Sequence, residues 1–251
     1  HYDLAEDAPQ AAHWYLQAGR LAARRFANAE ALQAYNRGLE LLAAGPADRQ
    51  YEVLAERERV YDLLGRRTEQ AQDLDRMETL LAELQDPARE AETALRRSQL
   101  ALTVGGYPLA LAAAEQATHL GAANHAPEVQ AAALIQMGQV HLRQGDFAGS
   151  LAQMEQAHAL ALAAGDRSLQ ADSLHGQAMA HVFLGNFDPA QAAFEAALAE
   201  AVAVGNRRLE CVLLNRLSWV PTSRNEFMLA AHYAEQALAV SREIGDRMTE
   251  A

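Results

Sequence analysis

A 40-residue period is the feature of this sequence that most restricts its fold. Glycines recur at this spacing, with an asparagine continuing the series: Gly65, Gly105, Gly145, Gly185 and Asn225. Two positions after all but the first stands an aromatic residue: Tyr107, Phe147, Phe187 and Phe227. Self-similarity at a fixed spacing of this size is typical of solenoids, in which each unit buries its apolar face against its neighbours.

Further series with the same period indicate that each unit is a pair of helices. The first glycines suit the end of a first helix, where a C-terminal cap needs a positive φ, and the aromatic residue opens the second helix. A second set of glycines ends the second helix, and the Asp or Asn that follows each can cap the next helix; this set is Gly165, Gly205 and Gly245. Small residues mark where the two helices cross: Ser98, Gly138, Ala178 and Ser218 on one helix, Ala110, Ser150, Ala190 and Ala230 on the other.

The composition agrees with a helical, cytoplasmic chain. Half of the residues are hydrophobic, alanine and leucine dominate, and there are only 7 prolines, which favours helix throughout. The formal net charge of −12 disfavours direct nucleic-acid binding, because an acidic surface repels phosphates. The single cysteine, Cys211, permits no internal disulfide and suggests a reducing compartment. No apolar run approaches the roughly 18–20 residues that a membrane span needs.

The pattern of small, glycine and aromatic positions resembles the tetratricopeptide repeat. One stretch carries the whole pattern: Ala178, Gly185, Phe187, Ala190, Phe194 and Ala197. The period is longer than the usual length of about 34 residues and overlaps that of HEAT and armadillo repeats, but the Gly-x-aromatic corner favours the tetratricopeptide interpretation. The resemblance implies an all-α fold, a right-handed α-α superhelix of about six helix pairs.

We expect residues 1–251 to form one solenoid cut from a larger protein. The repeats span approximately 12–48, 50–86, 87–126, 127–166, 167–206 and 207–246, and 247–251 would begin another. The second repeat is degenerate, with Glu58, Arg67 and Gln70 where other repeats have small, aromatic and small residues. In the sixth, Pro221 is expected to kink its helix or end it early.

The segment 1–42 carries a second resemblance. The run HYDLAEDAPQAAHWYLQAGRLAARRFANAEALQAYNRGLELL is similar to the segment that follows the ATPase module in bacterial signalling proteins of the STAND or AAA type. Some of those proteins carry a nucleotide cyclase domain and others are maltose-regulator-like transcriptional activators. The resemblance implies that this chain is the sensor or partner-binding arm of such a protein.

No catalytic, metal or cofactor motif is found. The chain has no lysine and hence no Gly-x4-Gly-Lys phosphate-binding loop. His141 and His181 lie in equivalent positions, where we expect two partly buried imidazoles rather than a metal site. Cys211 has no evident cationic partner to activate it and is expected to be a buried thiol. We therefore predict a protein that is not an enzyme and needs no cofactor.

The resemblance places a binding groove along the first helices of the repeats. The positions that map to it are His13, Leu16, Arg20, Arg24, Arg59, Asp62, Leu95, Gln99, Leu102, Ile135, Gln139, Arg143, His175, Met179, Phe183, Asn215 and Trp219. One end of this set is rich in arginine and would suit an acidic or carboxyl-terminated peptide. The other end is apolar and aromatic and would suit a small apolar ligand or a partner helix.

Two functions remain open at this point. The favoured one is a scaffold that binds a protein, a peptide or a small effector. The alternative is a structural spacer or a self-association module that forms a homodimer, because exposed ends of a repeat array tend to pair.

Overall fold

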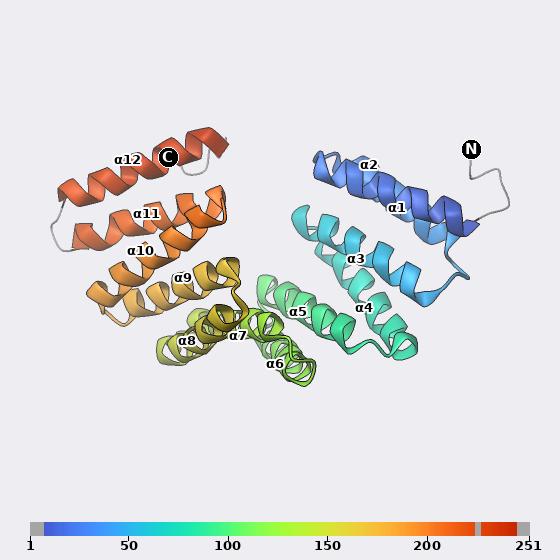
Figure 1. Ribbon diagram of the computed structural model, residues 1–251, viewed down its shortest axis with the longest axis horizontal. Helices are drawn as coiled ribbons and strands as arrows, with labels where there is room; N and C mark the ends of the chain where they lie inside the picture. The colour runs from blue at the N-terminus through green and yellow to red at the C-terminus, as the bar shows by residue number, and fades with distance from the viewer. Residues whose placement is uncertain (1–7, 224–226, 245–251) are drawn as a thin grey trace. The chain divides into compact units, whose positions relative to one another are not determined.

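The computed structural model describes residues 8–223 and 227–244, which hold twelve α-helices and no strand. This confirms the all-α prediction (Figure 1). The helices are α1 (Ala8–Arg24), α2 (Asn28–Leu41), α3 (Ala47–Leu63), α4 (Arg67–Leu84), α5 (Pro87–Thr103), α6 (Tyr107–Ala123), α7 (Pro127–Gln144), α8 (Phe147–Ala164), α9 (Arg167–Phe183), α10 (Phe187–Ala203), α11 (Arg207–Ser223) and α12 (Phe227–Ile244).

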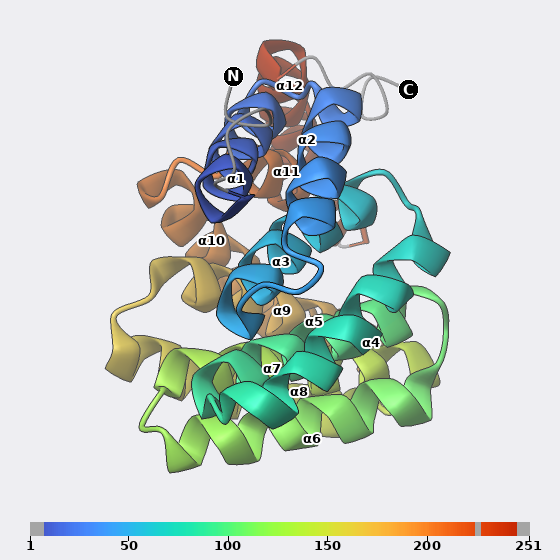
Figure 2. The ribbon, with the colours of Figure 1, turned by 90° about the vertical axis from the view of Figure 1, so that its right-hand side faces the viewer.

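The chain divides into two compact units, His1–Gly106 and Tyr107–Ala251. The first unit contains α1–α5 and the second contains α6–α12. Within each unit, helices that follow one another along the chain pack together, as α6, α7 and α8 do in the second unit (Figure 2). The single continuous array over residues 1–251 stays a prediction.

The turns between helices follow the predicted glycine positions. Gly65, Gly105, Gly145 and Gly185 have φ of +69°, +80°, +80° and +78°, a left-handed conformation that glycine adopts without a steric penalty. The aromatic residues two positions later begin α6, α8, α10 and α12, as expected. Asn225 and the Gly245 turn lie outside the described residues.

Three turns reach the left-handed conformation without glycine. Phe26, Gln85 and His125 have φ of 59°, 48° and 53°. Gln85 stands two periods before Gly165 and His125 stands one period before it, so both share its register. The left-handed residue after the second helix therefore keeps its register in these repeats even where the glycine is absent.

Two of the predicted helix caps are present, and the third, Asp246, lies outside the described residues. The carboxylate of Asp166 accepts a hydrogen bond from the Leu169 amide at 3.0 Å, and the Asn206 side chain accepts one from the Leu209 amide at 3.1 Å. These bonds satisfy amides that have no partner within their own helix.

Small residues lie at the helix crossings of the second unit, as the sequence predicts. Ser150, Ala178 and Ala190 are fully buried. Met154, also buried, packs between the backbones of Gly138 and Gly176, where a Cβ on either glycine would overlap the methionine side chain. The close approach of neighbouring helices thus depends on glycine at these two places.

The expectation that Pro221 could end the first helix of the sixth repeat early is wrong, whereas a kink there stays a prediction. α11 continues to Ser223, so Pro221 does not end the helix early. A proline in the last turn of a helix removes only one backbone hydrogen bond, and the carbonyls of that turn need other partners in any case.

Candidate functional site

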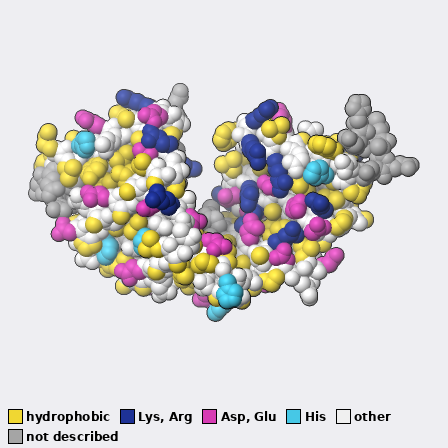
Figure 3. Space-filling model, viewed as in Figure 1, with side chains coloured by type: hydrophobic (Ala, Val, Ile, Leu, Met, Phe, Trp, Pro, Cys, Tyr) yellow, Lys and Arg dark blue, Asp and Glu magenta, His cyan; other side chains and the backbone are white. Residues whose placement is uncertain are grey.

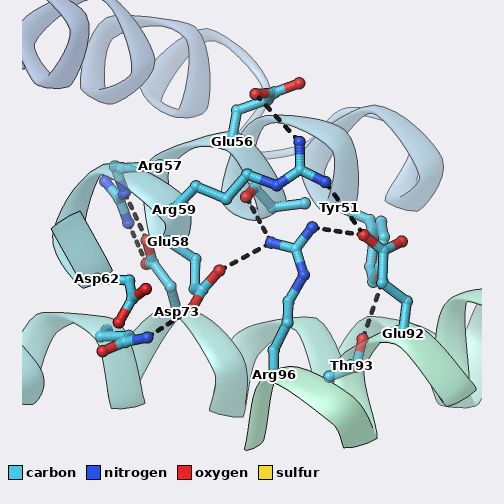
Figure 4. A network of polar contacts seen from close by, with 12 residues as sticks. Tyr51, Glu56, Arg57, Glu58, Arg59, Asp62, Asp73, Glu92, Thr93 and Arg96 are labelled. Atoms are coloured by element: carbon cyan, nitrogen blue, oxygen red, sulfur yellow. Dashed lines mark hydrogen bonds and ion pairs between the residues drawn. The ribbon is translucent and has the colours of Figure 1, made fainter. Parts of the chain in front are cut away.

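In the first unit, two arginines of the predicted groove are bound to carboxylates. Arg20 Nε lies 2.9 Å from Glu56 Oε1, which joins α1 to α3. Arg59 Nη2 lies 3.3 Å from Glu92 Oε1 on α5, and its Nη1 lies 3.9 Å from Glu56 (Figure 4). These guanidinium groups therefore already have anionic partners within the unit.

The degenerate second repeat is filled by a buried polar network. Glu58 and Gln70 stand at the crossing of α3 and α4, and Gln70 Nε2 donates to Glu58 Oε1 at 2.7 Å. Arg96 on α5 donates to Glu58 Oε2 at 2.8 Å, to Glu92 at 2.5 Å and to the Ala55 carbonyl at 2.7 Å (Figure 4). Two larger polar side chains thus replace two small ones by satisfying each other, which is the usual condition for burying polar groups.

A second buried ion pair holds α3 to α4. Arg57 donates two hydrogen bonds to the Asp73 carboxylate, at 2.8 and 2.5 Å, and Asp73 is 1% exposed. The arrangement is bidentate, which favours a fixed geometry. In Figure 3, blue and magenta side chains lie side by side over this unit, in keeping with the ion pairs on its surface, such as Arg59–Glu92 and Arg66–Glu69.

The apolar residues of the predicted groove come together in the second unit. Met179 and Phe183 on α9 and Trp219 on α11 line a pocket of about 440 Å³. The sequence pattern did not assign the other lining residues to the groove; they are Val182, Phe187, Phe194 and Arg216. Figure 3 shows hydrophobic side chains gathered over α11 and its neighbours.

The pocket lined by Met179, Val182, Phe183, Phe187, Phe194, Arg216 and Trp219 is called the aromatic pocket. Contacts between aromatic rings determine its shape. The rings of Phe147 and Phe183 stack with centroids 4.8 Å apart and an interplanar angle of 8°. Phe194 forms the buried floor at 1% exposure, whereas Phe183 and Trp219 are 53% and 60% exposed. Large apolar side chains left open to solvent around a concave surface are typical of binding sites.

Arg216 is the one charged residue that lines the pocket among those the structure describes. Its guanidinium carbon lies 4.8 Å from the centre of the Trp219 ring, a cation–π contact. Arg216 stands one period after Gly176. Gly176 packs against Met154 and lets two helices approach closely. In the next repeat the equivalent position holds Arg216, which borders the pocket instead.

His175 lies beside the pocket floor. Its ring centroid is 6.1 Å from that of Phe194, and its buried Nε2 has no hydrogen-bond partner among the described residues. Burial, followed by the nearby positive charge of Arg216, lowers the pKa of His175 to about 4. The imidazole is therefore neutral at neutral pH.

Other predicted groove residues form smaller groups in the first unit. Arg59, Asp62, Leu95 and Gln99 line a hollow of about 300 Å³ beside the buried polar network, and His13 and Leu16 line another of about 390 Å³. Leu16, Leu102 and Ile135 are 3%, 2% and 6% exposed, so most of each side chain packs into the core of its own unit; a part for them in a groove stays a prediction. The exposed members that lie away from the aromatic pocket are His13, Arg24, Gln99, Arg143 and Asn215. The partly exposed ones are Asp62, Leu95 and Gln139.

The single cysteine and the two aligned histidines occupy packing positions. Cys211 is buried at 1% exposure, as expected. His141 and His181 are half-buried, and His141 Nδ1 lies 3.0 Å from the Asp146 carboxylate. Within residues 8–223 and 227–244, no group of three His, Cys, Asp or Glu side chains is placed to hold a metal ion. Of the helices described, none has both the length and the apolar character of a membrane span.

Residues 129–201 match the family model of the tetratricopeptide repeat. No curated protein sequence matches the chain. Among solved structures, it is similar to a Rap protein complexed with competence and sporulation factor, with 12% identity and a TM-score of 0.79 over 99% of this chain and 70% of that one.

Two further structures share the fold. One is a signal transduction ATPase with numerous domains and a tetratricopeptide repeat sensor from Pyrococcus horikoshii, with 14% identity and a TM-score of 0.73 over 94% of this chain and 36% of that one. The other is the Cut9–Hcn1 hetero-tetramer of the APC/C, with 14% identity and a TM-score of 0.73 over 99% of this chain and 43% of that one. The chain therefore shares the fold of these structures, and the match to the tetratricopeptide repeat covers its residues 129–201.

Proposed function

We propose that this chain is a non-catalytic binding arm that takes a protein, a peptide or a small effector through the aromatic pocket between α9, α10 and α11. The pocket itself supports this proposal most directly. It is an open, mostly apolar cavity with a volume of about 440 Å³, and Phe183 and Trp219 are exposed at its rim. Its volume lies within the roughly 300–1,000 Å³ typical of ligand sites.

The contrast between the two units supports this location. Around Arg20 and Arg59 the charges are already paired by Glu56 and Glu92. An anionic ligand there would have to displace a bound carboxylate, which costs much of the energy that the new contact provides. The pocket of the second unit has apolar rings open to solvent, so covering them is favourable without displacing a partner.

The setting that we propose is a cytoplasmic, bacterial multidomain signalling protein in which the repeats form the sensor. The resemblance of residues 1–42 to such proteins motivates it, and a STAND protein with a tetratricopeptide repeat sensor has a similar fold. The Rap protein of similar fold is complexed with competence and sporulation factor, a precedent for ligand binding on this architecture.

Native mass spectrometry of the chain, purified gently from its own host, tests the proposal. The expected result is a reproducible added mass that disappears in Phe183→Ala and in Trp219→Ala. A matched variant, Arg20→Gln, should keep the added mass, because Arg20 belongs to the ion-paired surface of the first unit. Loss of the mass in Arg20→Gln but not in the pocket variants would refute this location.

Self-association is the second candidate, because Phe227 and Met228 on α12 are 61% and 87% exposed. Neighbouring apolar side chains that are open to solvent favour pairing with a second copy. Sedimentation velocity should then show a dimer that Met228→Ser dissociates, with no added mass in the native spectrum. A monomer at all concentrations would exclude this candidate.

A further inference from the structure

We infer that the ligand of the aromatic pocket is a small organic acid, a carboxylate on an aromatic or branched aliphatic body, whose anionic group binds Arg216. The inference rests on the function proposed above and names the chemical class of the effector. Two arginines that occupy the same place in different repeats have different surroundings, and this difference points to the acid.

Arg96 and Arg216 stand three periods apart in the same register. Arg96 is neutralised by Glu58 on α3 and by Glu92, which lies one helical turn before it on α5. The positions three periods after these carboxylates are Ala178, in the repeat before that of Arg216, and Val212, in the same repeat. Both partners are therefore replaced by apolar residues, while the arginine is kept.

No carboxylate among the described residues lies within ion-pair distance of Arg216. The guanidinium instead contacts the ring of Trp219 at 4.8 Å, which orients it, and no carboxylate in residues 8–223 and 227–244 compensates its positive charge. A partly buried arginine without a counter-ion is a strong recognition point for a carboxylate, because the guanidinium presents parallel donors.

The rest of the pocket defines the body of the ligand. Met179, Phe183, Phe187 and Phe194 supply apolar and aromatic walls, which favour an apolar group and offer no second charge. The volume of about 440 Å³ falls in the lower part of the roughly 300–1,000 Å³ range for small-molecule sites. His175, next to the floor, is uncharged at neutral pH because its pKa is about 4, so the positive charge at this site is that of Arg216.

A pair of probes that differ only in charge tests the inference on the whole chain. 2-Naphthylacetate and 2-naphthylacetamide have the same ring system and nearly the same size. Titration calorimetry with saturation-transfer NMR should show that the acid binds at least about tenfold more tightly than the amide, the effect expected of one charge-assisted contact. Arg216→Gln should abolish that difference, because it weakens binding of the acid far more than binding of the amide.

Two control variants locate the effect. Arg208→Gln removes an exposed arginine of the same helix and should leave both affinities unchanged. Phe183→Ala should weaken the acid and the amide alike, because it removes a wall that both rings contact. Circular dichroism melts of all variants check that they are folded.

The outcomes separate the inference from the function on which it rests. Equal binding of acid and amide, unaffected by Arg216→Gln but lost in Phe183→Ala, would overturn the inference and keep the pocket as an apolar binding site. Binding of neither probe would overturn the inference. The proposed function would then be tested separately, by whether the native mass spectrum shows an added mass that Phe183→Ala and Trp219→Ala remove. A peptide ending in phenylalanine that binds more than tenfold more tightly than naphthylacetate would overturn the free acid in favour of a peptide terminus.

Discussion

The substitution His125→Gly should raise the free energy of unfolding. It tests whether the packing of the helices imposes a left-handed backbone on this turn. Its φ is 53°, although it stands in the register of Gly165 and Gly205. A residue with a side chain pays roughly 1–2 kcal/mol for this left-handed backbone. The side chain of His125 is exposed, so His125→Gly removes little packing.

The expected gain is smaller than the full penalty. Glycine also gives the unfolded chain more freedom, which offsets roughly 0.4–1 kcal/mol. The net stabilisation by His125→Gly is therefore about 0.5–1 kcal/mol. At about 2–4 °C per kcal/mol for a unit of this size, the melting temperature should rise by about 1–4 °C.

Thermal unfolding followed by circular dichroism measures the shift, and urea unfolding gives the free energy. Asn124→Gly is the matched control, because Asn124 lies in the same turn with an ordinary backbone and glycine there should bring no gain. A His125→Gly variant that is no more stable than the parent, or that behaves like Asn124→Gly, would show that the packed helices do not impose strain on this turn.

Three further results are expected. Gly176→Ala should destabilise the chain by about 1–3 kcal/mol in urea unfolding, because its Cβ would overlap the enclosed side chain of Met154; unchanged stability would mean that the methionine can move aside. Asp73→Ala should cost roughly 3–5 kcal/mol because it leaves Arg57 largely buried without its bidentate partner, and the double variant with Arg57→Leu should recover part of that loss. The pKa of His175 in the folded chain is about 4, below the ordinary 6.5. On acidification the unfolded chain therefore binds a proton first, and stability falls as the pH drops from about 6.5 to about 4. His175→Phe should remove up to roughly 3 kcal/mol of that dependence, whereas an unchanged pH profile would contradict the burial of this ring.

The fold class and the positions of the turns could be predicted from the sequence alone. Left-handed backbone at Gly145 and Gly185, and second helices that begin at Phe147 and Phe187, follow directly from the repeated pattern. These features are local, because a C-cap glycine and a capping side chain act within a few residues of the chain. The period made each observation recur, which turned weak local signals into a firm prediction.

The packing of the helices determines which predicted groove residues bind carboxylates and which line a pocket. Arg59 and Trp219 belong to one register, yet the first contacts Glu92 across a helix interface and the second borders an apolar pocket. Whether an arginine has a partner depends on residues about one period away along the chain, whose side chains meet only when helices stack. Leu16 and Ile135 are almost fully buried for the same reason: the register gives the side of a helix, and the neighbouring helices determine how much of that side they cover.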